Sequence, residues 1–228
     1  MELNCRHAET TNDRGRSLAE AVLAWSSITA IFAIVFVAPV RAQDTNAGAV
    51  PQKEVQAKLA YCEVCHGVAA QGFNGYYPIP RLAGQQIAYI ENELQGFVEH
   101  KRTNNIMFNV GHVLSPAMIK ALATDFHDLN PKPLGGAPKD LAPAGEKIFQ
   151  QGLPDAGVPP CASCHGPEAK GNDQFPRLAG QLYPYLVGQL TNWASERGEN
   201  NANVMAPIAH GLTAPQIKAV AAYLSYLE

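Results

Sequence analysis

Pro80-Arg81-Leu82-Ala83-Gly84-Gln85 recurs unchanged as Pro176-Arg177-Leu178-Ala179-Gly180-Gln181. A Cys-x-x-Cys-His motif precedes each copy of this hexapeptide, and a methionine follows it. The shift between the copies is 99 residues for the motif, 96 for the hexapeptide and 98 for the methionine. Because the shift changes between landmarks, the copies differ by small loop insertions. A repeat of this length predicts that one structural unit occurs twice in the chain.

Apolar residues at helical spacing follow both copies of the hexapeptide. They begin at Ile87 and at Tyr183, and a second pair of amphipathic segments begins after Ser115-Pro116 and after Thr213-Ala214-Pro215. A Ser or Thr shortly before a proline is typical of a capped helix start. No alternating run of useful length predicts a strand. The sequence therefore predicts an all-α fold.

The segment 130–138, Asn-Pro-Lys-Pro-Leu-Gly-Gly-Ala-Pro, separates the two copies. Its prolines and glycines cannot continue a helix, so it is predicted to be a linker. We expect an N-terminal domain over residues 43–135 and a C-terminal domain over residues 136–228. Domains of about 90 residues have little core of their own. The long loops 67–80 and 166–176 are therefore expected to wrap a ligand.

Residues 1–42 are predicted to be a signal peptide. No charged residue occurs from Ala21 to Val40, arginines precede this segment, and Val40-Arg41-Ala42 offers small residues where a signal peptidase cleaves. Twenty uncharged residues could also form a retained membrane anchor or a buried helix. Cleavage after Ala42 is the preferred interpretation, and it predicts a periplasmic protein.

The composition excludes several classes of protein. Hydrophobic residues make up 46% of the chain and charged residues 16%, which argues against a disordered protein. A formal net charge of −3 argues against a basic nucleic-acid-binding protein. Five cysteines are too few for a disulfide scaffold, and four of them fall in two identical patterns.

Cys62-Glu63-Val64-Cys65-His66 and Cys161-Ala162-Ser163-Cys164-His165 both have the pattern of covalent haem c attachment. Two thiols one helical turn apart can bond to the two vinyl groups on one haem edge, and the adjacent histidine then faces the iron. Two such motifs, in register with an independent repeat, predict two covalently bound haem c groups.

The cysteine pairs have three other interpretations. Two Cys-x-x-Cys pairs could bind Zn²⁺, but structural zinc pairs are normally about 15 to 20 residues apart, whereas nearly a whole domain intervenes here. A thioredoxin-like redox pair needs a βαβ setting, for which the sequence gives no sign. Each pair could also form a strained disulfide in an exported protein. The thioredoxin-like pair would also not need the histidine that follows each motif.

On these residues the chain resembles the cytochrome c4 family, the dihaem members of the class I c-type cytochromes. The resemblance rests on the two haem motifs, each followed by a glycine, on the doubled hexapeptide, and on a methionine ahead of the last helix of each half. It covers essentially all of residues 43–228. It implies two tandem class I cytochrome c domains, each a few short helices wrapped around a covalent haem.

The resemblance also implies how each haem is held. In such proteins histidine and methionine ligate the iron, the proline after the motif offers its carbonyl to that histidine, and the next arginine faces a haem propionate. In the N-terminal half the implied cofactor-binding residues are Cys62, Cys65, His66, Pro80, Arg81 and Met107. In the C-terminal half they are Cys161, Cys164, His165, Pro176, Arg177 and Met205.

The two methionines have rivals as iron ligands. Met107 and Met205 align with each other, and no other methionine serves both halves. His112 and His210 also align and lie five residues further on, so ligation by two histidines stays open. Met205 is followed by Ala-Pro, as is common in the family, and Met107 is not.

These features predict an exported electron carrier that is not an enzyme. A thioether ligand raises the reduction potential relative to a second imidazole. Residues 43–135 carry seven basic and eight acidic side chains and residues 136–228 six and eight, so neither half is a strongly charged docking face. Partners would meet a weakly polar patch around an exposed haem edge. The resemblance implies a quinol-oxidising complex or a dehydrogenase as donor and a terminal oxidase as acceptor, with membrane contact only through partners or a retained anchor.

Two rival functions come from other classes. The chain could be the dihaem electron-accepting subunit of a dedicated dehydrogenase, of the flavocytochrome sulfide dehydrogenase type. It could also be an enzyme such as a dihaem peroxidase, in which one iron needs an open or displaceable position. Two matched methionines argue against the peroxidase.

Overall fold

The computed structural model describes residues 49–197 and 204–228, which belong to one compact unit. The predicted signal peptide over residues 1–42 lies outside the described residues. Within the described residues all regular structure is helical, and the extended contacts are three isolated bridges. The all-α prediction is therefore confirmed.

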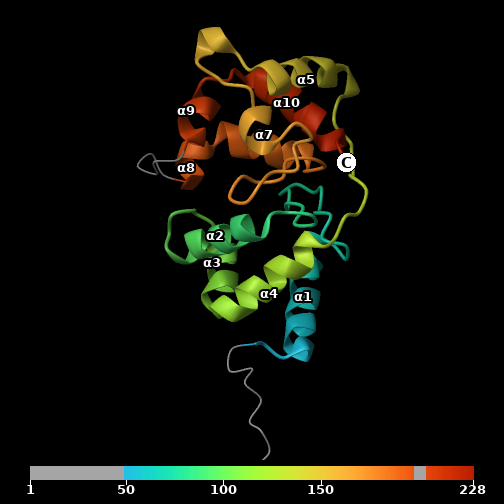
Figure 1. Cartoon of the computed structure of the whole chain (residues 1–228), viewed down its shortest axis with the longest axis vertical. Helices are drawn as coiled ribbons and strands as arrows, with labels where there is room; N and C mark the ends of the chain where they lie inside the picture. The colour runs from blue at the N-terminus through green and yellow to red at the C-terminus, as the bar shows by residue number, and fades with distance from the viewer. Residues whose placement is uncertain (1–48, 198–203) are drawn as a thin grey trace, which may run out of the picture. The chain divides into compact units, whose positions relative to one another are not determined.

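The N-terminal half contains four helices around one core (Figure 1). They are α1 (Gln52–His66), α2 (Ile87–Val98), α3 (Asn105–His112) and α4 (Pro116–His127). α4 packs against both α1 and α2, and α2 packs against α3. Leu122 and Phe126 of α4 are almost fully buried in this core.

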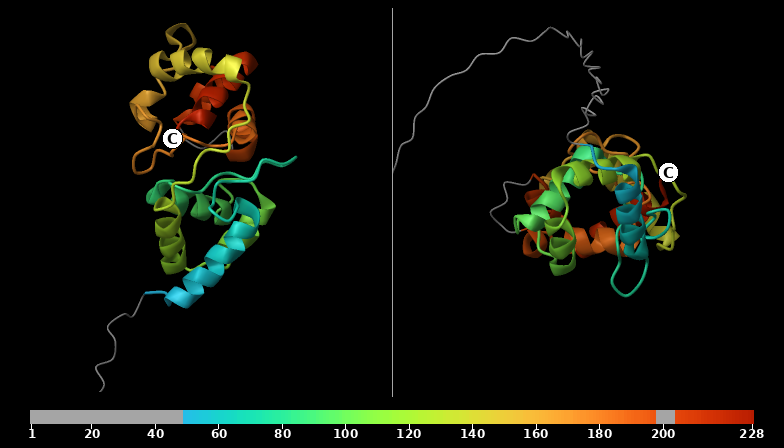
Figure 2. Two further views of the ribbon diagram at one scale, coloured as in Figure 1. Left: turned by 90° about the vertical axis from the view of Figure 1, so that its right-hand side faces the viewer. Right: turned by 90° about the horizontal axis from the view of Figure 1, so that it is seen from below.

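The C-terminal half repeats this plan with more breaks. Its elements are η1 (Lys139–Leu141), α5 (Ala142–Gln151), η2 (Pro154–Ala156), α6 (Ala162–His165), α7 (Tyr183–Thr191), α8 (Trp193–Arg197), α9 (Met205–His210) and α10 (Ala214–Tyr226). α10 packs against α5 and α7 (Figure 2). Phe149 of α5 is fully buried in a second core, separate from the first.

The haem motif is attached to its helix differently in the two halves. In the N-terminal half α1 runs without a break into Cys62, Cys65 and His66. In the C-terminal half α5 ends at Gln151 and is followed by Gly152, which has φ of +68°. A Cβ there would lie 2.4 Å from the carbonyl oxygen of Val158, so only glycine fits. The motif therefore sits on α6, a separate helix of one turn.

Local capping places the last helix of each half. Ser115 accepts a hydrogen bond from the backbone N–H of Met118 at 3.2 Å, and Pro116 begins α4. In the other half the Gln216 side chain accepts from the backbone N–H of Thr213 at 2.8 Å, as in a capping box. Both helix starts are as the sequence predicted.

The helices α5 and α10 of the C-terminal half approach each other closely at Gly145 of α5. A Cβ at Gly145 would lie 2.0 Å from the carbonyl oxygen of Ala219 in α10. The absence of a side chain therefore lets the two backbones touch, and the contact brings Phe149 into the core.

Among the described helices, none is by itself both long and apolar enough to span a bilayer; α3 and α4 would be so only together, and they are bent by 115° to one another.

Candidate haem site

Each haem motif ends a helix, and its histidine points into the protein. His66 is the last residue of α1 and His165 the last of α6, and both are buried. Gly67 and Gly166 follow with φ of +88° and +79°, a conformation that favours glycine. The chain therefore turns away directly after the histidine, which leaves the two cysteines and the imidazole of each motif on one helical turn.

A backbone carbonyl orients each histidine. Nδ1 of His66 lies 2.8 Å from the carbonyl oxygen of Pro80, and Nδ1 of His165 lies 2.9 Å from that of Pro176. Because a carbonyl only accepts hydrogen bonds, Nδ1 carries the proton in both rings. Nε2 is then the nitrogen left to bind a metal.

The charge states in both motifs suit covalent haem. Burial lowers the pKa of His66 and of His165, against the opposing effect of the hydrogen bonds to proline, so the imidazoles are neutral as iron ligation requires. Burial also raises the pKa of Cys62 and Cys161, which argues against a reactive thiolate of the thioredoxin type. The residues of both candidate sites therefore fit a covalently bound haem.

The other interpretations of the cysteines find no support in the described part of the chain. Cys62, Cys65, Cys161 and Cys164 are all free thiols there, with no disulfide among them. No three His, Cys, Asp or Glu side chains of the described residues come together as a metal site. Zinc therefore has no ligand set in this part of the fold.

The candidate methionines occupy similar places in the two halves. Met107 lies in the first turn of α3 and packs against the first core, and Met205 begins α9 and is half-buried. The rivals His112 and His210 end the same two helices and are exposed. His112 stacks on Phe108 with ring centroids 5.6 Å apart.

Arg81 and Arg177 are buried where the two halves meet, and each Nε donates to a carbonyl two residues further on. Arg81 also donates to the carbonyl of Pro131 at 2.8 Å and to the side chain of Asn130. Burial, with the nearby charge of Arg177 as the smaller cause, lowers the pKa of Arg81 to about 10. Among the described residues no carboxylate lies within ion-pair distance of either arginine.

The sequence predicted no role for Gln85 and Gln181, the last residues of the two hexapeptides. Both are buried, and the amide of each binds backbone atoms of the other half: Gln181 at Arg81 and Gln85 at Arg177. Their identical placement in the repeat was a signal that both halves need them. It did not show that they act across the junction.

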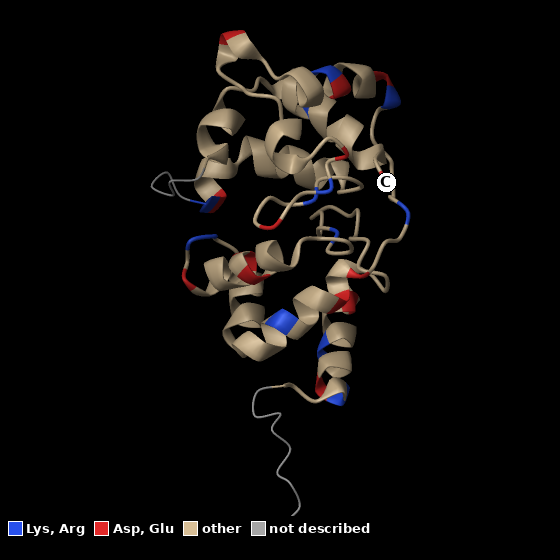
Figure 3. Cartoon of the chain, viewed as in Figure 1, with Lys and Arg blue, Asp and Glu red and all other residues tan. Residues whose placement is uncertain are grey.

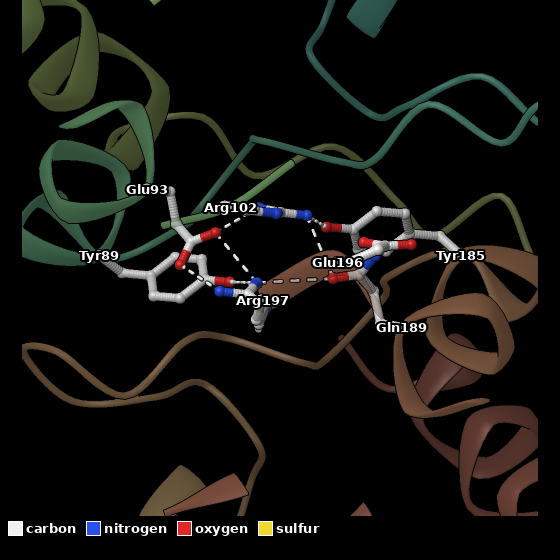
Figure 4. Close-up of polar contacts among 7 residues, drawn as sticks. All are labelled: Tyr89, Glu93, Arg102, Tyr185, Gln189, Glu196 and Arg197. Atoms are coloured by element: carbon white, nitrogen blue, oxygen red, sulfur yellow. Dashed lines mark hydrogen bonds and ion pairs between the residues drawn. The ribbon is translucent and has the colours of Figure 1, made fainter. Parts of the chain in front are cut away.

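A second group of contacts across the junction was also missed. Figure 4 shows Glu93 between Arg102 and Arg197, with ion pairs to both. Arg102 donates to Tyr185 at 2.8 Å, and Arg197 donates to Tyr89 at 3.4 Å. Burial alone would raise the pKa of Glu93, but the two arginines outweigh it and hold that pKa below its usual value.

Comparison with known proteins agrees with this geometry. The Cytochrome c family matches residues 142–228. Cytochrome c-552 of Acidithiobacillus ferridurans is 40% identical over 73% of this chain and 73% of its own length. The thiosulfate dehydrogenase electron acceptor of Thiomonas intermedia is 35% identical over 74% of this chain and 79% of its own. Cytochrome c4 of Thiocapsa roseopersicina is 35% identical over 73% of this chain and 87% of its own.

The solved structure of Acidithiobacillus ferrooxidans cytochrome c4 superimposes with a TM-score of 0.65 at 39% identity, covering 74% of this chain and 99% of that one. A buried histidine after two cysteines on one helical turn, in a small helical fold, defines a c-type cytochrome. Such proteins carry electrons on covalent haem c. The chain belongs to the cytochrome c4 family, which consists of electron-transfer proteins, and it has the class I cytochrome c fold.

Proposed function

We propose that this protein is an exported carrier with two covalent haem c groups, one in residues 43–135 and one in residues 136–228. It takes electrons from a quinol-oxidising complex or a dehydrogenase and passes them to a terminal oxidase. Bound haem would supply the one-electron chemistry of iron. The protein supplies the ligands, their orientation and the docking surface.

One observation carries the proposal. Both motifs end in a buried histidine whose Nδ1–H is already bonded to a proline carbonyl, at 2.8 Å in one half and 2.9 Å in the other. This arrangement fixes the tautomer and the orientation of an axial ligand. Since it occurs twice with the same partners, each half is equipped for a haem of its own.

The remaining candidate residues fit the same site. Met107 and Met205 are partly buried whereas His112 and His210 are exposed, which favours the methionines as the second residue that would hold the iron in each half. A buried pair of arginines without a carboxylate needs an anion to offset its charge, and a haem propionate would provide one. This supports the assignment of Arg81 and Arg177 to the propionates.

The surface near the methionines suits transient docking. α3 and α9, which carry Met107 and Met205, have no Asp, Glu, Lys or Arg, and neither has α7 (Figure 3). Redox partners of carriers meet through small interfaces that release quickly. Helices without charged side chains at each methionine would let one surface serve both donor and acceptor.

The intact mass of the exported protein tests this function. We expect residues 43–228 plus two haems, with a visible spectrum of low-spin, six-coordinate iron that does not bind carbon monoxide. A mass with one haem, with zinc or with no cofactor would contradict the proposal. Ready binding of carbon monoxide or turnover of peroxide would favour the peroxidase instead.

A second candidate has specific support. A relative at 35% identity is named a thiosulfate dehydrogenase electron acceptor. This chain could therefore be the electron-accepting partner of one dedicated dehydrogenase. Purification from the native membrane and periplasm distinguishes the two functions, because a dedicated partner would co-purify with a catalytic subunit and a shared carrier would not.

A further inference from the structure

The two halves are joined by a pair of reciprocal amide contacts. Oε1 of Gln181 accepts from the backbone N–H of Arg81 at 2.9 Å, and its Nε2 donates to the carbonyl of Arg81 at 3.0 Å. Gln85 makes the same two contacts with Arg177, at 2.7 and 3.1 Å. Both glutamines are only 6% exposed. Each glutamine therefore forms two hydrogen bonds with one short stretch of backbone in the opposite half.

That backbone is the one that orients the histidine. The N–H of Arg81 and the carbonyl of Pro80 belong to a single peptide group. The carbonyl accepts from Nδ1 of His66 at 2.8 Å, while the N–H donates to Gln181 at 2.9 Å. A continuous chain of two hydrogen bonds therefore runs from the histidine of the N-terminal half to a glutamine of the C-terminal half.

A matching chain of two hydrogen bonds runs from the histidine of the C-terminal half to a glutamine of the N-terminal half. Nδ1 of His165 lies 2.9 Å from the carbonyl of Pro176, and the N–H of the same peptide group donates to Gln85 at 2.7 Å. The connection is crossed: each histidine is linked to the glutamine of the opposite half.

A peptide group transmits polarisation between its two ends. When its N–H donates a hydrogen bond, its carbonyl oxygen becomes more negative, and the next bond strengthens by about 10 to 30%. A stronger acceptor at Nδ1–H makes the imidazole more basic at Nε2. A more basic axial ligand favours Fe(III) over Fe(II), which lowers the reduction potential.

We propose that Gln181 is a positioning residue that lowers the potential of the haem in the N-terminal half, and that Gln85 does the same for the haem in the C-terminal half. The inference rests on the proposed function, since it takes His66 and His165 as iron ligands. It makes the potential of each haem depend on the other half of the molecule.

The test uses the holoprotein with Gln181→Met and, separately, Gln85→Met. Each change keeps the volume of the side chain and removes its amide. For Gln181→Met we expect a threefold to tenfold rise in the ratio of reduced to oxidised iron at a fixed solution potential. The rise is confined to the N-terminal haem and equals about 30 to 60 mV for a one-electron couple. Gln85→Met should raise the reduction potential of the C-terminal haem alone.

Two readouts assign the effect to the hydrogen-bond chain. The proton resonance of His66 Nδ1–H in the reduced protein should move upfield in Gln181→Met, because its hydrogen bond weakens. Combining each glutamine variant with a ligand variant, Met107→His or Met205→His, identifies which haem has shifted. A shift in the same half as the substitution, an equal shift in both halves, or no shift overturns the proposal.

Gln86→Met is the matched control. The Gln86 side chain also crosses the junction, donating to the carbonyl of Lys170 at 2.9 Å, but it does not touch the backbone of Arg177. We expect both potentials to stay unchanged. An effect as large as that of Gln181→Met would show that loosening the junction is enough, and would overturn the proposal.

If Gln181→Met fails to fold, Gln181→Glu gives an independent test, since it keeps an acceptor for the N–H of Arg81 beside two buried arginines. It should move the His66 Nδ1–H resonance downfield and lower the N-terminal potential, and an unmoved resonance overturns the proposal. Unaltered protein with fewer than two haems would contradict the proposed function. Two haems with unmoved potentials in the glutamine variants contradict the coupling only.

Discussion

At the scale of single residues, one pair of variants can decide the second iron ligand of the haem proposed for the N-terminal half. Met107→Ala should abolish low-spin six-coordinate iron at that haem, because alanine offers no donor atom. His112→Ala should leave the spectrum and potential unchanged, since His112 is exposed at the end of α3. Optical and electron paramagnetic resonance spectra of both variants check this. The reverse pattern would assign the site to two histidines.

The residues proposed to bind haem covalently could be predicted from the sequence because their chemistry requires neighbours in the chain. The two cysteines and the histidine of each motif lie on one helical turn. Gln85 and Gln181 were not readable in this way. Their hydrogen-bond partners lie 92 and 100 residues away, and a repeat does not reveal whether a residue acts within its own copy or on the other.

At the scale of helices, the contact between α5 and α10 depends on Gly145. Gly145→Val would place side-chain carbons on the backbone of Ala219, so the helices must move apart. Overpacking of this kind costs about 3 kcal/mol of unfolding free energy. Chemical denaturation of the holoprotein, followed by far-ultraviolet circular dichroism, measures the loss.

Gly188→Ala in α7 is the control for that experiment. Gly188 is also a helical glycine of the C-terminal half, but a Cβ there meets nothing within 4 Å. We expect the unfolding free energy to stay the same or to rise by up to about 1 kcal/mol, because alanine favours the helix. A large loss at Gly188 would mean that any added side chain in this half is harmful.

Helix starts were predictable and helix breaks were not. Ser115 and Thr213 cap their helices through atoms within three residues, so the local sequence suffices. The break between α5 and α6 requires that Gly152 pack against the backbone of Val158. This contact depends on how the loop folds back, whereas the repeat predicted small loop insertions without showing where a helix would break.

At the scale of the whole described molecule, Glu93 balances two buried arginines. Glu93→Gln would leave Arg102 and Arg197 without their shared carboxylate. We expect unfolding free energy to fall by about 2 to 4 kcal/mol at neutral pH, as for other broken buried ion pairs. Glu99→Gln is the control, since Glu99 pairs with Lys101 on the surface and should give no measurable change.

The same carboxylate predicts how stability responds to acid. The pKa of Glu93 is lowered on folding, so its contribution is fully present above the unfolded value of about 4.5. The contribution is lost as the pH falls through the lower value of the folded protein. The difference in stability between the unaltered protein and Glu93→Gln should therefore be constant at neutral pH and shrink in strong acid. Denaturant titrations across that range measure it, and a difference that persists in acid would contradict the assignment.

The reciprocal glutamine contacts bind peptide atoms and no side chain of the opposite half. Such a contact depends on the path of the backbone and not on which side chain the residue carries. A half-molecule from a relative should therefore dock in place of the native one if it keeps the hexapeptide and the side chains that pair with Glu93 and Arg102 across the junction, even where much of its remaining sequence differs. The junction is therefore a point at which we expect halves of different origin to be exchanged, with both contact groups kept.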